Sequence, residues 1–125
     1  MTDHESILAL LQDYFDGFHT GDVGKLQRVF HPACHLYSAA DGPLQDDDMP
    51  AVYRRVEGRE PPAERRQTRQ DRVLTLDWTA PEMALAKVQL AIGPKLFTDY
   101  LSLLKVDGRW QIIAKAYTYV AIDPA

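Results

Sequence analysis

The sequence predicts an α+β domain in which a curved, mostly antiparallel sheet wraps around helices at the N-terminus. Apolar residues recur at helical spacing in the first 30 residues, and a period of two replaces that spacing from residue 71 onward. Between residues 95 and 122, Asp107-Gly108 separates two long apolar arms, which favours a hairpin with a type I′ turn. Segregated helices and strands are typical of α+β proteins, and a strongly twisted sheet curls, so we expect the first helix on its concave side.

The composition indicates a single domain spanning residues 1–125. A net charge of −4 argues against nucleic-acid binding, which usually needs a basic face. The single cysteine, Cys34, cannot form an internal disulfide, and the N-terminus has neither a basic segment nor a long apolar run. We therefore expect a cytoplasmic protein without a membrane partner.

The first helix is predicted from Asp3 to His19. Thr2 and Glu5 have the spacing of a capping box, and Gly21 supplies a left-handed stop. The apolar stripe of this helix comprises Ile7, Leu8, Leu11, Tyr14, Phe15 and Phe18. Asp22 is a suitable N-cap for a short second helix.

The second helix should end at His31-Pro32, because the residue before a proline avoids helical geometry. We expect His31 to cap it, and a short strand to follow over residues 33–39. Asp41-Gly42-Pro43 breaks that strand. A short third helix should begin near Pro50, preceded by the acidic run 46–48.

The rest of the chain predicts an exposed loop and four consecutive antiparallel strands. The loop covers residues 58–70, which hold a Pro-Pro pair and no periodicity. Strands are predicted at 73–78 and 83–92 with a turn at 79–82, followed by the two arms of the hairpin.

This order of elements resembles the nuclear transport factor 2-like (SnoaL-like) superfamily, a cone-shaped α+β barrel. The resemblance rests on LLQDYFDGFHTGDVGKLQRVFHP (10–32), on Asp41-Gly42, and on FTDYLSLLKVDGRWQIIAKAY (97–117). The small lumazine-binding-like bacterial proteins are the most similar branch. The resemblance implies a homodimer formed through the sheet, and a pocket between the first helix and the concave face. It does not fix the activity, because this superfamily includes enzymes and adaptors.

The ketosteroid isomerase branch of that superfamily uses a carboxylate base, a tyrosine on the first helix and a protonated acid on the sheet. Tyr14 matches the tyrosine position, and Asp99 or Tyr100 lies near that of the acid. Ser38 stands where the base belongs, and serine is not a usable base near neutral pH without an activating partner. The sequence therefore argues against that particular mechanism.

Asp99 is the main candidate for chemistry. It shares the period-two set of the most apolar residues in its strand, and a carboxylate facing the core is costly unless it is paired or protonated. It would be an acid, a base or a ligand anchor in a pocket; otherwise it turns to solvent at a bulge, or pairs with Lys115 or an arginine. Without a bulge, Lys115 lies opposite Tyr100. Trp110, Ile112, Ala114 and Ala116 make the other face of the last strand apolar, so the sequence leaves open which face is concave.

Metal and cofactor chemistry has little support in the sequence. His31 and His35 have the i, i+4 spacing of a helical zinc site, but Pro32 prevents a regular helix across them. Cys34 lacks a suitably placed basic partner for a catalytic thiolate. No glycine-rich phosphate loop or paired-cysteine motif occurs. We expect neither a metal nor a cofactor.

Half of the basic residues lie in one arginine-rich stretch, 54–72, with acidic residues interleaved. Such a stretch is usually a solvated loop, and the alternatives are a lid over a pocket or a site for an anionic ligand.

The expected function is the binding of a small aromatic or carbonyl-containing molecule. If the protein is an enzyme, we expect non-covalent acid–base chemistry of the isomerase, dehydratase or cyclase type, with Asp99 as acid or base and Tyr14 as hydrogen-bond donor. The expected pocket residues are Tyr14, Phe18, His35, Tyr37, Tyr53, Asp99, Lys115 and Tyr117. The alternative is a non-catalytic dimerisation or adaptor module whose pocket is closed by its own side chains.

Overall fold

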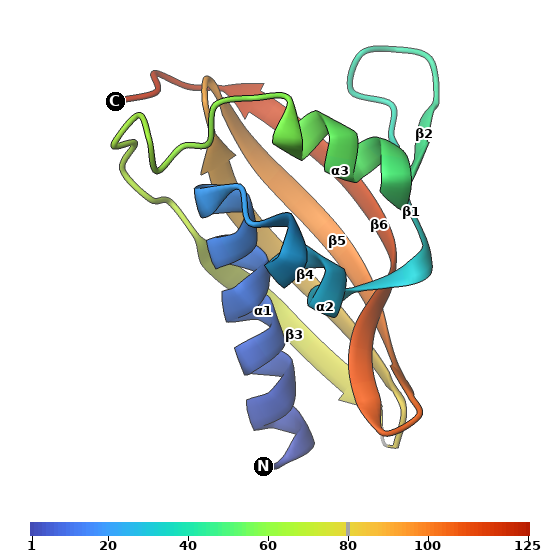
Figure 1. Ribbon diagram of the computed structural model, residues 1–125. Coiled ribbons are helices and arrows are strands. Elements are labelled where there is room, and N and C mark those ends of the chain that lie inside the picture. The colour runs from blue at the N-terminus through green and yellow to red at the C-terminus, as the bar shows by residue number, and fades with distance from the viewer. Residues whose placement is uncertain (80) are drawn as a thin grey trace.

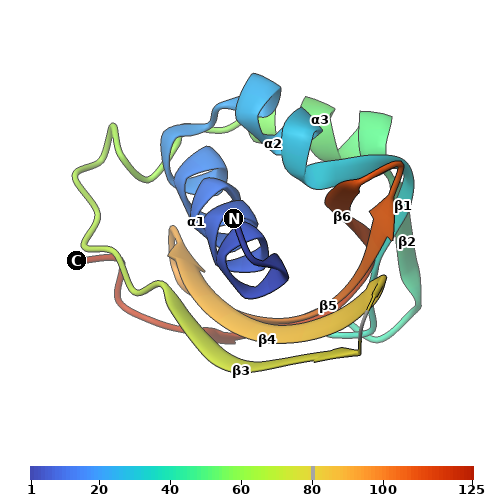
Figure 2. The same ribbon diagram turned by 90° about the horizontal axis from the view of Figure 1, so that it is seen from below.

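The computed structural model describes residues 1–79 and 81–125, and it has two layers, a curved sheet and the helices packed on its concave face (Figures 1 and 2). The elements are α1 (Asp3–Thr20), α2 (Val23–Val29), β1 (Phe30–Ser38), β2 (Gln45–Asp48), α3 (Met49–Glu57), β3 (Arg72–Thr79), β4 (Met83–Ile92), β5 (Lys95–Val106) and β6 (Arg109–Ala121). The sheet order is β2-β1-β6-β5-β4-β3, with β1 and β6 parallel and the other pairs antiparallel. The predicted α+β architecture is confirmed. The sheet curls around α1 but does not close, because β2 and β3 remain as edges.

Helix α1 lies against the concave face as the sequence predicts. Thr2 and Glu5 form the capping box, and Gly21 ends the helix with φ of 72°. Ile7, Leu11 and Tyr14 are almost completely buried, so this helix fills the hollow of the sheet. None of the helices among residues 1–79 and 81–125 combines the length and apolar character needed to cross a bilayer.

Two predictions about the junction between α2 and β1 are wrong. Strand β1 starts at Phe30 rather than at residue 33, and His31 accepts a hydrogen bond from the backbone N–H of Ala33 (3.0 Å) instead of capping α2. The acidic run belongs to strand β2, which pairs with β1, so tertiary pairing overrides the low strand propensity of aspartate. Asp48 then caps α3 through the N–H of Ala51 (3.0 Å).

The segment from 58 to 70 lacks helices and strands, as predicted, but it is not wholly exposed. Pro62 and Gln67 are buried. The Gln67 side chain bonds both the N–H (2.9 Å) and the C=O (2.8 Å) of Gly93, which ties this segment to the β4–β5 turn. The predicted turn at 79–82 includes Ala80, which lies outside the described residues.

A bulge in the β5–β6 hairpin decides which side chains enter the hollow. The turn forms at Asp107-Gly108, where both φ angles are positive, as a type I′ turn requires. Near the turn Leu103 lies opposite Ile112, but the register then shifts by one residue, so that Ser102 lies opposite Ala114. Lys115 therefore faces Leu101 and not Tyr100.

Because of this bulge, one face of β6 points to the concave side before the bulge and the other face does so after it. Trp110 and Ile112 are buried before the bulge, and Lys115 is buried after it. A shift of one residue exchanges the two faces of a strand, which is why alternation alone did not identify the concave face.

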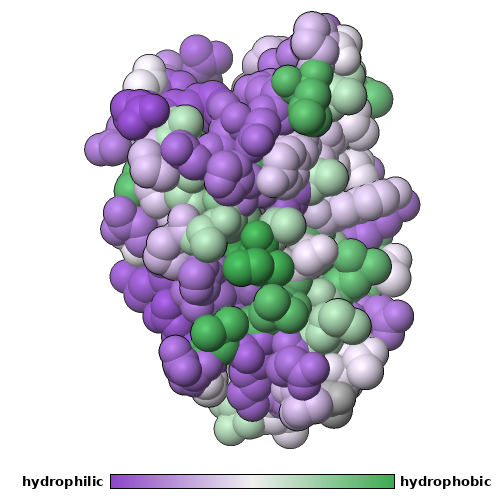
Figure 3. All heavy atoms as spheres, turned by 90° about the vertical axis from the view of Figure 1, so that its right-hand side faces the viewer, coloured by the Kyte–Doolittle hydropathy of each residue, from purple (hydrophilic) through white to green (hydrophobic). Residues whose placement is uncertain are grey.

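One side of the molecule, that of β1 and β2, is hydrophilic towards its ends and has a band of hydrophobic side chains across its middle (Figure 3). Exposed large hydrophobic residues also occur elsewhere: Leu44 in the β1–β2 loop, and Leu8, Trp78, Met83, Leu85, Tyr100 and Val120 on other elements. An isolated apolar side chain at the surface is normal, whereas a continuous apolar patch marks a contact.

We expect the Cys34 thiol to be nearly inert in the folded protein. Its side chain is completely buried, and burial raises its pKa to about 12. At pH 8 its reaction with a disulfide reagent should be at least about a hundredfold slower than in urea-unfolded protein, because the thiolate is the reactive form. A native rate close to the unfolded rate would contradict this burial.

Candidate functional site

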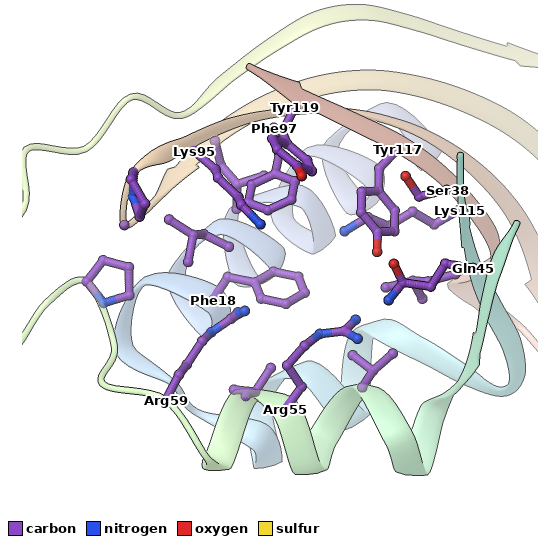
Figure 4. Close-up of a pocket in the computed structure, with 18 of the residues that line it drawn as sticks. Phe18, Ser38, Gln45, Arg55, Arg59, Lys95, Phe97, Lys115, Tyr117 and Tyr119 are labelled. Atoms are coloured by element: carbon purple, nitrogen blue, oxygen red, sulfur yellow. The ribbon is translucent and has the colours of Figure 1, made fainter. Parts of the chain in front are cut away.

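A cavity of about 500 Å³ opens between α3, the loop after it, and the far ends of β5 and β6 (Figure 4). Aromatic and cationic side chains dominate its walls. Phe18 of α1 lies at the back, Arg55 and Arg59 enter from the α3 side, and the sheet contributes Lys95, Phe97, Lys115, Tyr117 and Tyr119. Smaller contributions come from Ser38, Gln45 and the edge residue Asp41.

Three of the predicted site residues form a buried cluster directly behind this cavity. The Tyr14 hydroxyl donates a hydrogen bond to Asp99 Oδ2. Lys115 Nζ donates to the Tyr14 oxygen at 2.7 Å and lies 3.3 Å from Asp99 Oδ2. Tyr14 and Asp99 are completely buried and do not line the cavity, whereas Lys115 does. Lys115 therefore separates the other two groups from any molecule in the cavity.

The surroundings of Lys115 shift the pKa of its amine in opposite directions. Burial lowers the pKa of the amine, while the Asp99 carboxylate acts to raise it, and burial prevails. The ammonium group also lies over the rings of Phe18 (4.9 Å), Tyr14 (5.2 Å) and Tyr117 (5.2 Å), a favourable cation–π arrangement. A lysine amine with a lowered pKa can gain and lose a proton closer to neutral pH than an exposed lysine.

The surroundings keep Tyr14 protonated, and they leave one oxygen of Asp99 to make both of its contacts. Burial and, after it, the Asp99 charge raise the pKa of Tyr14 well above its usual value, so Tyr14 remains a phenol. Asp99 Oδ1 is buried, and no described residue provides it with a hydrogen-bond partner. The carboxylate thus directs its other oxygen, Oδ2, at both Tyr14 and Lys115.

The structure places Phe18, Lys115 and Tyr117 in the cavity wall, as the sequence predicts, but not His35, Tyr37 or Tyr53. His35 and Tyr37 stack on each other on the outer side of β1, and His35 Nδ1 lies 2.6 Å from Asp46. Leu36, between them, points inward, so alternation along β1 sends both rings away from the cavity. Tyr53 lines a separate pocket beside Phe30 and Met49.

The expected pocket residues did not include Arg55, Arg59, Phe97 or Tyr119, although a site for an anionic ligand was an alternative for the stretch 54–72. A signal for the two arginines was present. Val52, Arg55, Val56 and Arg59 have the i, i+3, i+4, i+7 spacing of one helical face, and all four line the cavity. Interpreting residues 54–72 as one charged stretch hid this face, because Arg55 belongs to α3 and Arg59 directly follows its C-cap, Gly58.

The arrangement differs from the oxyanion hole that the ketosteroid isomerase resemblance implies. Ser38, at the position of the base, lines the cavity but carries no carboxylate. The Tyr14 hydroxyl donates its proton to Asp99, so it has none left to donate to a substrate. The polar group that the cluster presents to the cavity is the Lys115 amine.

The fold and the helix-filled hollow define a nuclear transport factor 2-like protein. Within this superfamily the chain belongs to the family described as putative lumazine-binding, which matches residues 2–118. A similar solved structure is a nuclear transport factor 2-like protein of unknown function from Shewanella baltica, with a TM-score of 0.84, 20% identity and 94% of each chain covered.

Two further relatives carry names that refer to chemistry. A ketosteroid isomerase-like protein from Erwinia carotovora atroseptica has a TM-score of 0.72 and 11% identity, covering 97% of this chain and 99% of its own. The aldolase FrzH of Cladobotryum sp. is 22% identical over 118 residues, which cover 93% of this chain and 90% of the aldolase. At such identities the solved structures establish the fold alone.

We expect the stabilities of Asp99 and Lys115 variants to be strongly coupled. Lys115→Met leaves a buried carboxylate without its cation and should lower the free energy of unfolding by about 3–5 kcal/mol. In the double variant Asp99→Asn/Lys115→Met, the loss of unfolding free energy should be smaller than the sum of the losses in the two single variants, because no unpaired charge remains. Urea denaturation provides the measurement.

Lys87→Met is the control for this cycle, because Lys87 lies over Tyr100 on the outer side of the sheet. Its effect should stay within about 0.5 kcal/mol. Additive losses at Asp99 and Lys115 would show that the two charges do not interact.

Proposed function

We propose that the protein is an enzyme that binds a small aromatic or carbonyl compound in this cavity and moves a proton at the carbon next to the carbonyl group. The observation that carries the proposal is the Lys115 amine, which faces the cavity while Tyr14 and Asp99 hold it from behind. A perturbed ionisable group in a cleft is a candidate for acid–base work, and a cavity of about 500 Å³ suits a small molecule.

In the proposed reaction, the neutral Lys115 amine removes a proton from the carbon beside the carbonyl group. The C–H electron pair moves into the enolate, and the lysine becomes an ammonium ion. That ammonium ion then stabilises the enolate oxygen in a site with little water, where electrostatic interactions are strong. If the compound has a double bond between the β- and γ-carbons, return of the proton to the γ-carbon would isomerise it. Attack of the enolate carbon on a second carbonyl would instead form a carbon–carbon bond, and the Lys115 ammonium would give its proton to the new alkoxide.

In this proposal Lys115 is the catalytic residue, and the roles first expected for Asp99 and Tyr14 change. Both are positioning residues, because Lys115 lies between them and the substrate. The names of the relatives support the choice of chemistry: an aldolase joins carbon atoms next to carbonyl groups, and a ketosteroid isomerase moves a proton beside one. The alternative, a non-catalytic module with a filled pocket, is less favoured because the cavity is not filled by side chains of the chain itself.

Proton exchange at an aromatic ketone tests the proposal directly. In D₂O, the protein should accelerate deuterium uptake into the methyl group of acetophenone, followed by proton NMR. The rate should rise with pH, because the amine is the active form, and its midpoint should lie below the usual lysine pKa of about 10.4, since burial lowers the pKa of Lys115. Lys115→Met should abolish the exchange, and Lys87→Met should leave it unchanged.

The pH profile also distinguishes positioning from a merely structural role. Asp99 raises the pKa of Lys115, so Asp99→Asn should move the midpoint to lower pH. Exchange that persists in Lys115→Met would refute the assigned role. If acetophenone and a panel of aromatic and pterin-like compounds neither exchange deuterium nor raise the melting temperature, the adaptor alternative would be favoured.

We also propose that two copies pair through the outer face of the sheet. Leu85 of β4, Tyr100 of β5 and Val120 of β6 are exposed there by 49%, 54% and 61%. Sedimentation should give twice the chain mass of 14.2 kDa at micromolar concentration. Tyr100→Glu should give the monomer mass, because a buried unpaired charge opposes association; a monomeric unmodified protein would contradict this pairing.

A further inference from the structure

The guanidinium group of Arg59 is the least compensated charge in the cavity. Its side chain lines the cavity just after the C-terminus of α3 and is only partly exposed. Among residues 1–79 and 81–125, no carboxylate forms a salt bridge with it and no side chain accepts a hydrogen bond from it. Burial, and then the neighbouring Arg55, lower its pKa, as expected for a cation held without a counter-ion.

The other cations around the cavity have partners. Lys115 pairs with Asp99 (3.3 Å), Arg55 with Asp47 (2.9 Å) and Arg65 with Glu60 (3.1 Å). Lys95 Nζ lies 4.2 Å from the centre of the Tyr119 ring, a cation–π contact. The remaining carboxylate in the wall, Asp41, accepts a hydrogen bond from the Tyr119 hydroxyl. The cavity is therefore positively charged on balance. Arg59 is the cation that would be stabilised most by an anionic ligand, because it has no other counter-ion among the described residues.

The opposite wall of the cavity is aromatic. Phe97 packs at 5.8 Å from Tyr117 and 5.6 Å from Tyr119, and the three rings line the sheet side facing the arginines (Figure 4). Such a wall suits a flat ring through stacking and apolar contact. Across the cavity, a planar guanidinium fork suits a carboxylate or phosphate group.

We infer that the ligand of this cavity is a flat compound carrying a carboxylate or phosphate group, and that Arg59 binds that group. The inference rests on the proposed ligand binding in this cavity but not on proton transfer by Lys115. The ring lies against Phe97, Tyr117 and Tyr119, with its anionic group turned to Arg59. Arg55, already bonded to Asp47, adds a second positive charge beside it.

A structural role for Arg59 is the competing explanation. A cation near the C-terminus of a helix is favoured by the helix dipole, by about 0.3–1 kcal/mol at exposed sites. Arg54 and Arg55 already occupy the last turn of α3, so the dipole does not need a third cation, and it does not explain why the side chain of Arg59 points into the cavity. The two explanations differ in one measurable respect, which is preference for an anionic ligand.

The test compares two probes that have the same ring but differ in charge and contain no ketone: 2-naphthoate and 2-naphthamide. Calorimetric titration should show that the unmodified protein binds 2-naphthoate about ten- to a hundredfold more tightly than the amide, the range expected for a hydrogen-bonded ion pair. Arg59→Gln should remove most of this preference and leave the affinity for the amide almost unchanged. Arg54→Gln, on the exposed side of α3, is the matched control and should keep the preference.

Several outcomes would overturn the inference: equal affinity of the unmodified protein for both probes, an unchanged preference in Arg59→Gln, or an equal loss in Arg54→Gln. The last of these would indicate a general effect of net charge. If Arg59→Gln does not fold, Arg59→Lys keeps the charge without the fork and should reduce the preference only in part. Comparing 2-naphthoate with 2-naphthyl phosphate identifies which anionic group fits. Because none of these probes has a C–H group on a saturated carbon next to a carbonyl, failure here is distinguishable from failure of the Lys115 chemistry.

Discussion

The structure depends on how a lysine ammonium group is accommodated inside the hollow of the sheet. An isolated charge in the core is costly, and it persists only with a partner. Asp99 from β5 provides the opposite charge, and Tyr14 from α1 donates a hydrogen bond to Asp99 and accepts one from Lys115. This contact fixes helix α1 against the two longest strands, and it fixes the polar group that the cavity presents.

The β6 bulge makes this contact possible. With regular alternation, Lys115 would lie on the opposite face from Trp110 and Ile112, outside the hollow that those two residues fill. The extra residue shifts the register between Ile112 and Ala114 and turns Lys115 inward. Sequence patterns predict the hairpin, because Asp-Gly and two apolar arms are local signals. They do not locate the bulge, because Ile113 and Ala114 are ordinary strand residues and the register depends on pairing with β1 and β5.

The same distinction between local and distant signals explains which parts of the site were predictable. The capping box of α1, the bounds of β4 and the importance of Asp99 follow from local spacing. The partners of Asp99 are 85 residues before it and 16 residues after it in the chain, and only the curl of the sheet brings them together. His35 and Tyr37 were misplaced because alternation tells which residues share a face of a strand but not which face is inside. Arg59 lies beyond the predicted helix, although its spacing from Val52 and Val56 continues the inward face.

The cluster also shows how one framework can present different polar groups to its cavity. Tyr14 and Asp99 stand near positions that, by resemblance, an isomerase would use to bind an oxyanion, yet here they bond to each other and to Lys115. The group available to a ligand is therefore the Lys115 amine, which lies nearer to the cavity mouth than Tyr14 and Asp99. A ligand that reaches Lys115 must then occupy the space between the aromatic wall and α3, which is where Arg55 and Arg59 point. Tyr14 and Asp99 hold Lys115 in place, and Lys115 limits how deep a ligand can enter. A ligand stopped at Lys115 lies within reach of Arg55 and Arg59.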